Sequence, residues 1–162
     1  MTRTLVSRSF RLLGAALVVG VGVAASTGVV AAQLDGGPRG TLVVDVRDLR
    51  SDGGSVRCSL YASRDGYPTE ASRAVARAEG RPHARQARCT FENVAPGSYA
   101  VSVHHDEDGD GVFDTGIFGI PLEGVGASRD AHGTMGPPSF EDARIDVPAG
   151  ETRIVVHVTH AL

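Results

Sequence analysis

Short runs of alternating apolar and polar residues, separated by turn signals, constrain the fold of this chain more than any other feature. In residues 55–62, Val56, Cys58 and Leu60 alternate with Arg, Ser and Tyr, which is the period of a strand with one buried face. Similar strand-like runs occupy residues 41–49, 83–94, 99–105, 143–147 and 152–159. Gly, Pro and Asp residues punctuate the gaps between them. This spacing predicts an all-β sandwich.

Residues 63–80 interrupt the alternation. Thr69 is a suitable N-cap for a short helix over residues 70–79, and Gly80 is suited to end it. Because Val75 is the one large apolar residue in that segment, we expect a crossover helix on the surface rather than a core element.

The first 32 residues read as an export signal. Three arginines precede 21 uncharged residues, and small residues close the segment at Val30-Ala31-Ala32. An uncleaved membrane anchor is the alternative, because the apolar run is long for a signal. We therefore expect residues 33–40 to form a flexible leader and residues 41–162 to form the domain. The predicted location is exported: periplasmic, cell-surface or secreted.

The charge balance limits the class of partner. Removing residues 1–32 takes away three arginines and no acid, which leaves 13 arginines against 19 acidic residues and a net charge of −6. An acidic domain with no basic run is unsuited to nucleic acid or to an anionic lipid surface. Any membrane association would then pass through the N-terminal segment, if that segment stays uncleaved.

The chain has two cysteines, Cys58 and Cys89. Both fall on inward strand positions, and an even count in an exported chain predicts one disulfide. The alternative is a pair of buried free thiols that act as small hydrophobes.

An acidic stretch follows the run at 99–105. Its carboxylates fall at positions 1, 3, 5 and 9 of a calcium-loop template, and Gly111 falls at position 6, where a sharp turn is needed. Alternate residues of a tight loop point inward, so short carboxylates can converge on one hard cation. The predicted metal ligands are Asp106, Asp108, Asp110, the carbonyl of Val112, and Asp114.

The calcium template is incomplete. Position 12 holds Ile117 where a bidentate glutamate belongs, so binding should be weak, on the order of 10⁻⁴ to 10⁻³ M, unless Glu123, Glu141 or Asp142 folds back. The alternative is an acidic turn held by Asx-type hydrogen bonds without an ion. The glycine-rich loop that continues to residue 142 is expected to pack back onto the sandwich through Phe118, Ile120 and Phe140.

The histidines do not form a metal motif in the sequence. His104 and His105 are adjacent on a strand and so point to opposite faces, and we expect His105 to be a structural residue at the sheet edge. A hydrolytic or metal-dependent enzyme would instead gather His105, Asp106 and Glu141 in one cleft. No nucleophile elbow, zinc-protease helix, P-loop or dinucleotide fingerprint supports that alternative.

Several motifs resemble a known family. Residues 89–101 resemble the strand of transthyretin-like sandwiches in which a Pro-Gly turn precedes a tyrosine, here Tyr99, whose hydroxyl would bond back to the turn as in a tyrosine corner. Residues 105–111 and 118–128, together with 136–143 and 66–68, are similar to the exported bacterial family of unknown function numbered 2141. The resemblance covers about residues 41–159. It implies a seven-stranded transthyretin-like or immunoglobulin-like sandwich of unassigned role.

Together these features predict an exported β-sandwich without catalytic activity, which binds a cell-envelope protein or a glycan. Calcium is the expected cofactor, held weakly by the acidic loop. A purely structural module remains a further alternative.

Overall fold

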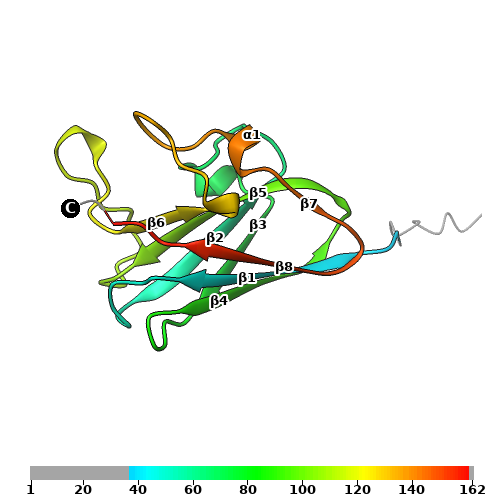
Figure 1. The fold of residues 1–162 in the computed structure, drawn as a ribbon, viewed down its shortest axis with the longest axis horizontal. Coiled ribbons are helices and arrows are strands. Elements are labelled where there is room, and N and C mark those ends of the chain that lie inside the picture. Colours follow the sequence, from blue (N-terminus) through cyan, green and yellow to red (C-terminus); the bar gives the residue numbers. More distant parts are fainter. Residues whose placement is uncertain (1–36, 161–162) are drawn as a thin grey trace, which may run out of the picture. The chain divides into compact units, whose positions relative to one another are not determined.

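The computed structural model describes residues 37–160, and within them the chain is all-β (Figure 1). The predicted signal segment 1–32 and the start of the leader lie outside the described residues. The described strands are β1 (Gly40–Arg47), β2 (Ser55–Tyr61), β3 (Ala76–Gly80), β4 (Ala87–Val94), β5 (Gly97–Asp106), β6 (Gly124–Ala127), β7 (Ile145–Val147) and β8 (Gly150–His157). The helical elements are the α-helix α1 (Phe140–Ala143) and the 3₁₀ turns η1 (Ala71–Arg73), η2 (Ile117–Gly119) and η3 (Ser128–Asp130).

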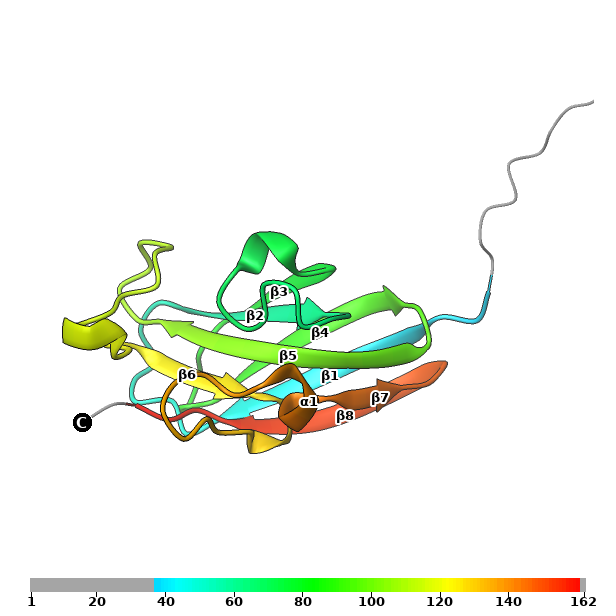
Figure 2. The same ribbon diagram turned by 90° about the horizontal axis from the view of Figure 1, so that it is seen from above.

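The strands form two sheets. One has the order β4-β1-β8, and the other has the order β3-β2-β5-β6, with β7 pairing the opposite end of β5 from β6. Only the β1–β8 pair among these is parallel. Figure 2 shows β5 running between β2 and β6, so that the end of this long strand carries the acidic loop away from the sheets.

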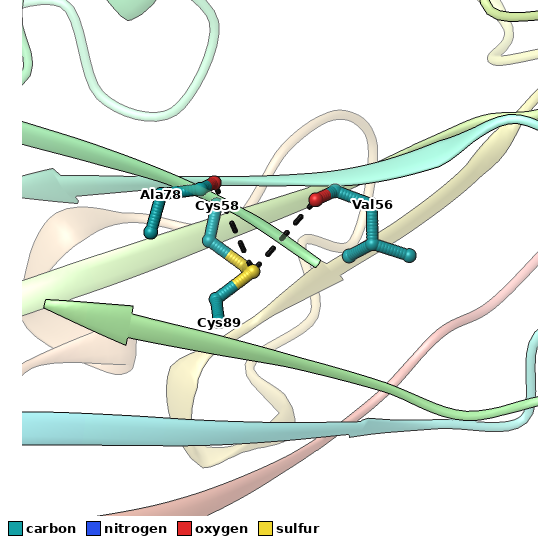
Figure 3. The surroundings of a disulfide bond; sticks show 4 residues. All are labelled: Val56, Cys58, Ala78 and Cys89. Carbon is teal, nitrogen blue, oxygen red and sulfur yellow. Dashed lines mark hydrogen bonds between the residues drawn. A yellow bond between two sulfur atoms is a disulfide. The ribbon is translucent and has the colours of Figure 1, made fainter. Parts of the chain in front are cut away.

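The core lies between the two sheets and consists mainly of aliphatic side chains from both. The predicted inward residues Val56, Cys58 and Leu60 are all buried. Cys58 of β2 and Cys89 of β4 form the predicted disulfide, which joins one sheet to the other (Figure 3). Closing a loop with a sequence separation of 31 stabilises the fold by about 3.5–4 kcal/mol in the chain-entropy account.

The predicted crossover helix over residues 70–79 is wrong. Only Ala71–Arg73 form a 3₁₀ turn, and Ala76–Gly80 form strand β3. Ala76 and Ala78 pack against the core while Arg77 and Glu79 are exposed. Small residues and arginines favour a helix locally, but pairing along β2 and burial of the two alanines outweigh that preference.

The number of strands also differs from the expected seven, because eight are present in residues 37–160. Strands β3 and β6 were not predicted. The run expected at 83–94 becomes a strand only from Ala87, since His83 and Gln86 close a turn through backbone hydrogen bonds.

The glycine-rich loop after β5 is more structured than expected and packs differently. It contains β6, two 3₁₀ turns and α1. Of the three residues expected to pack back, Phe140 lies against Tyr67, with ring centroids 5.9 Å apart. The expectation for Phe118 and Ile120 is wrong, because their exposed fractions are 96% and 50%.

Candidate functional site

The acidic loop begins at a buried carboxylate. Asp106, the last residue of β5, is fully buried. Its Oδ1 accepts a hydrogen bond from the Gly109 amide at 2.9 Å, and its Oδ2 accepts one from the Gly111 amide at 3.1 Å. The Arg57 guanidinium lies 3.0 Å from the same Oδ2. The charge of Asp106 is thus paired and hydrogen-bonded within the chain.

Neighbouring segments fix this arrangement. Arg57 projects from β2 and also donates to the Gly111 carbonyl at 3.1 Å, so one side chain holds both ends of the turn. The β1–β2 turn passes so close that a Cβ at Gly54 would lie 1.8 Å from the Asp106 carbonyl oxygen. With a φ of +64° as well, position 54 requires glycine.

Asp108 and Asp110 are exposed and bond to the turn itself. Asp108 Oδ1 accepts from the Asp110 amide at 3.1 Å, and Asp110 Oδ1 accepts from the Val112 amide at 2.7 Å. These are Asx turns. One carboxylate oxygen from each of Asp106, Asp108 and Asp110 also lies within 4.8 Å of the others. Oxygens on opposite sides of a calcium ion lie up to about 5 Å apart, so both sequence interpretations have contacts in their favour.

Asp114, the fourth predicted carboxylate, experiences the charge of this loop. Partial desolvation and the nearby carboxylates of Asp110, Asp108, Glu123 and Asp106 raise the pKa of Asp114 above its ordinary value. A cation bound among these carboxylates would oppose this shift and lower the pKa of Asp114.

Glu123, a candidate closing ligand, folds back but binds other groups. Its Oε1 accepts from the Glu107 amide at 3.0 Å, and its Oε2 accepts from the Asp114 amide at 3.3 Å and from His104 Nε2 at 2.5 Å. Burial alone would raise the pKa of Glu123, but these three hydrogen bonds lower it below its ordinary value. Glu123 thus fixes the two ends of the loop and pairs with His104. No spacing in the sequence indicated either role.

The other two candidate closing ligands lie elsewhere. Glu141 is exposed in α1 and pairs with Arg144 at 2.9 Å, and Asp142 bonds the Ser139 hydroxyl at 2.6 Å. Helix α1 packs near Ala100 of β5. Five residues of strand, about 17 Å, separate Ala100 from His105, so the structure does not gather His105, Asp106 and Glu141 in one cleft.

The two predicted structural residues lie at opposite ends of β5. The Tyr99 hydroxyl donates to the Ala95 carbonyl at 2.8 Å, which is the contact of a tyrosine corner. His105 is fully buried, and its Nε2 donates to the Gly53 carbonyl at 3.0 Å. His105 thereby ties the β1–β2 turn to the end of β5.

Beyond Asp114 the loop forms a hairpin, residues 114–122, that turns its apolar residues outward. The Leu122 amide donates to the Asp114 carbonyl and the Gly116 amide donates to the Ile120 carbonyl. At its tip the exposed fractions of Ile117 and Phe118 are 78% and 96%. Figure 2 shows this yellow loop extending past the strand ends. The arrangement presents exposed apolar side chains beside a cluster of carboxylates.

Comparison with known proteins identifies the family. The family model described as "uncharacterized protein conserved in bacteria", DUF2141, matches residues 44–155. The searches of curated proteins and of solved structures returned no match. Within residues 37–160, no helix has the length and apolar character needed to cross a membrane. The match covers well over half of the sequence, and the chain therefore belongs to the DUF2141 family.

Proposed function

We propose that this protein is an exported, non-catalytic binding module that attaches to a protein of the cell envelope through the apolar tip of hairpin 114–122. The observation that carries the proposal is the exposure of Ile117 and Phe118 on a hairpin closed by its own backbone hydrogen bonds. Large apolar side chains placed together in water are typical of interaction sites. Phe118 has a φ of +63°, a conformation that costs free energy for a residue with a side chain.

The base of the hairpin supports this function because it is fixed. Glu123 holds Glu107 and Asp114 together, and His104 lies edge-on to Phe113 with ring centroids 5.0 Å apart. A preorganised hairpin loses little conformational entropy on binding.

The chemistry of the tip favours a protein over a glycan. Sugar-binding surfaces stack sugars on aromatic faces, whereas this chain has no Trp. Phe118 is the one aromatic among the exposed apolar side chains of hairpin 114–122, and the others are aliphatic: Ile117, Ile120 and Leu122. Aliphatic anchors suit an apolar pocket on a protein. The net charge of −6 after residue 32 opposes insertion into anionic lipid.

The proposal includes export of the protein and the assignment of its two sheets to a known type of sandwich. A disulfide between two sheets persists in an oxidising compartment, and residues 1–32 have the composition of a signal. We assign the pair of sheets to the transthyretin-like and immunoglobulin-like sandwiches, which the Tyr99 hydrogen bond supports.

Calcium is the proposed cofactor, with Asp106, Asp108, Asp110, Asp114 and the Val112 carbonyl as ligands. The 4.8 Å grouping of three carboxylates and the raised pKa of Asp114 support it. Because Arg57 and two amides already occupy Asp106, the ion would share that carboxylate, and the affinity should be in the millimolar range, on the order of 10⁻³ M.

The test compares the wild-type protein with the double variant Ile117→Ser/Phe118→Ser. Each is cross-linked to the envelope fraction of the source cells in the presence of millimolar calcium. A protein captured by the wild type and lost with the double variant is the expected result. Val75→Ser is the matched control, because Val75 is also apolar and is 60% exposed outside the hairpin. Equal capture by all three proteins would refute the binding role, and binding of the hairpin to neutral lipid vesicles would replace the protein partner by a membrane.

A further inference from the structure

A second group of metal-ligating side chains lies beside the acidic loop and shares no ligand with it. One ligand atom from each of His105, Glu107 and His160 lies within 4.8 Å of the others. His105 and Glu107 flank Asp106 in the chain, and His160 comes from the segment after β8. Neither the spacing of these residues nor any motif brings them together in the sequence.

The backbone places His160 in this group. Thr159 exchanges two hydrogen bonds with Val125, at 2.8 and 2.9 Å, which fixes the segment after β8 beside β6. The next residue, His160, occupies the space left by the missing side chain of Gly124, because a Cβ there would lie 2.6 Å from His160 Nε2. Gly124 in turn pairs with His105 across β5 and β6.

His105 has the tautomer of a metal ligand. A carbonyl only accepts hydrogen bonds, so the contact with Gly53 requires a proton on Nε2 and leaves the lone pair on Nδ1. A backbone carbonyl that accepts from the other ring nitrogen is a typical support for a histidine ligand. His105 is fully buried, yet Nδ1 has no hydrogen-bond partner within the described chain.

His160 presents a second buried nitrogen without a partner. Its Nε2 makes no hydrogen bond to the described residues and lies 3.7 Å from Glu107 Oε1. Burial and the charge of Arg50 lower the pKa of His160, although Glu107 opposes this shift.

We propose that His105 Nδ1, His160 Nε2 and a Glu107 carboxylate oxygen form a binding site for a divalent transition-metal ion of the zinc type. Two imidazoles and one carboxylate are a known ligand set for such ions, and they leave one position open. Ligation gives both unpartnered nitrogens a partner, where each otherwise carries the cost of an unsatisfied buried polar atom. Bonds of about 2.0–2.1 Å require ligand atoms roughly 3.3 Å apart, so the group contracts on binding.

Arg50 is the competitor for this site. It bonds both Glu107 oxygens, at 2.8 and 3.3 Å. Its side chain is 52% exposed, so it can move into water at small cost when the ion takes its place. Removal of this competing cation should strengthen metal binding.

The test is calorimetric titration of the EDTA-treated, full-length protein with Zn²⁺, at a calcium concentration that saturates any oxygen site. The disulfide excludes thiol ligands from Cys58 and Cys89. We expect one site, with affinity lowered more than about 100-fold in His160→Gln and in Glu107→Gln, and raised in Arg50→Gln. His157→Gln is the matched control, because His157 is exposed and pairs with Asp130 at 2.8 Å.

Replacement of Zn²⁺ by Co²⁺ gives a second readout, since the visible spectrum of cobalt reports its ligand geometry. A tetrahedral spectrum that disappears in His160→Gln supports the site. Absence of zinc binding by the folded wild type would overturn the proposal. So would equal zinc affinity in the wild type and the two ligand variants, which would assign binding to the other histidines.

Discussion

Two groups of possible metal ligands lie at the same end of β5: the acidic group Asp106–Asp108–Asp110 and the histidine group His105–Glu107–His160. They differ in how far hydrogen bonds within the protein already satisfy their polar atoms. In the acidic group, Asp106 receives two amide hydrogen bonds and an arginine, and the exposed Asp108 and Asp110 accept from the turn. In the histidine group, two buried ring nitrogens have no partner among the described residues.

This difference shows that a match to a metal-ligand spacing and a buried polar atom without a partner are separate indications of a metal site. The acidic group follows a calcium template, but its contacts already satisfy Asp106 without an ion. The histidine group follows no template, but its buried nitrogens gain most from a ligand. The spacing of the carboxylates and the unpaired buried nitrogens thus favour different groups as the metal site.

The largest effect on stability is expected for Asp106→Ala. The change leaves Arg57 without its partner and two turn amides without their acceptor. Arg57 is 40% exposed and can turn to water, so the loss in free energy of unfolding should be about 2–3 kcal/mol, below the range for fully buried pairs. Urea unfolding of the oxidised protein measures it. A loss no greater than that of an exposed ion pair would mean that Asp106 is not a structural anchor.

A smaller effect is expected for His105→Leu without metal. The Gly53 carbonyl loses its donor, but the buried Nδ1 without a partner is also removed. The two changes oppose each other, and the free energy of unfolding should change by less than about 1 kcal/mol. Zinc should then stabilise the wild type and leave this variant unchanged. A metal-free loss as large as that of Asp106→Ala would show that His105 already has its partners within the fold.

The strands with clear alternation were predictable because burial of one face leaves a period of two in the sequence. The inward positions Cys58 and Cys89 also followed from that period, and with them the disulfide. Strand β3 was missed because its buried face consists of two alanines, which carry little strand signal. Short β6 was missed because Gly124 and Gly126 interrupt its pattern.

The sites were less predictable because contacts between distant segments decide them. The acidic spacing was visible, but neither the pairing of Arg57 with Asp106 nor the turn of Glu123 toward His104 follows from local sequence. The position of His160 depends on Gly124, 36 residues earlier in the chain. A contact between residues so far apart leaves no local pattern in a single sequence.

Substitution of Asp45 should have a smaller effect than that of Asp106, because both arginines that pair with Asp45, Arg88 and Arg153, are exposed to water. Burial raises the pKa of Asp45, but hydrogen bonds from Arg88 and Arg153 outweigh it, and the net pKa lies below the ordinary value of 3.8. Asp45→Asn should therefore cost about 0.5–1 kcal/mol at neutral pH, measured by urea unfolding.

The pH dependence of this pair has a defined sign. A carboxylate whose folded pKa is depressed contributes fully above its unfolded pKa, and the contribution is lost as the pH falls through the folded pKa. The wild type and Asp45→Asn should therefore differ in stability at neutral pH and converge below the ordinary value of 3.8. A difference that persists in strong acid would assign the effect to packing rather than to charge.

The smallest effect on stability is expected for Asp108→Ala and Asp110→Ala in chelator. Each loses one Asx hydrogen bond but also relieves repulsion between neighbouring carboxylates, so the melting temperature should hardly change. At millimolar calcium the wild type should melt higher than either variant if the ion binds. If calcium leaves all three melting curves unchanged, the acidic group is a hydrogen-bonded turn, and the histidine group is the metal site that remains to be tested at this end of β5.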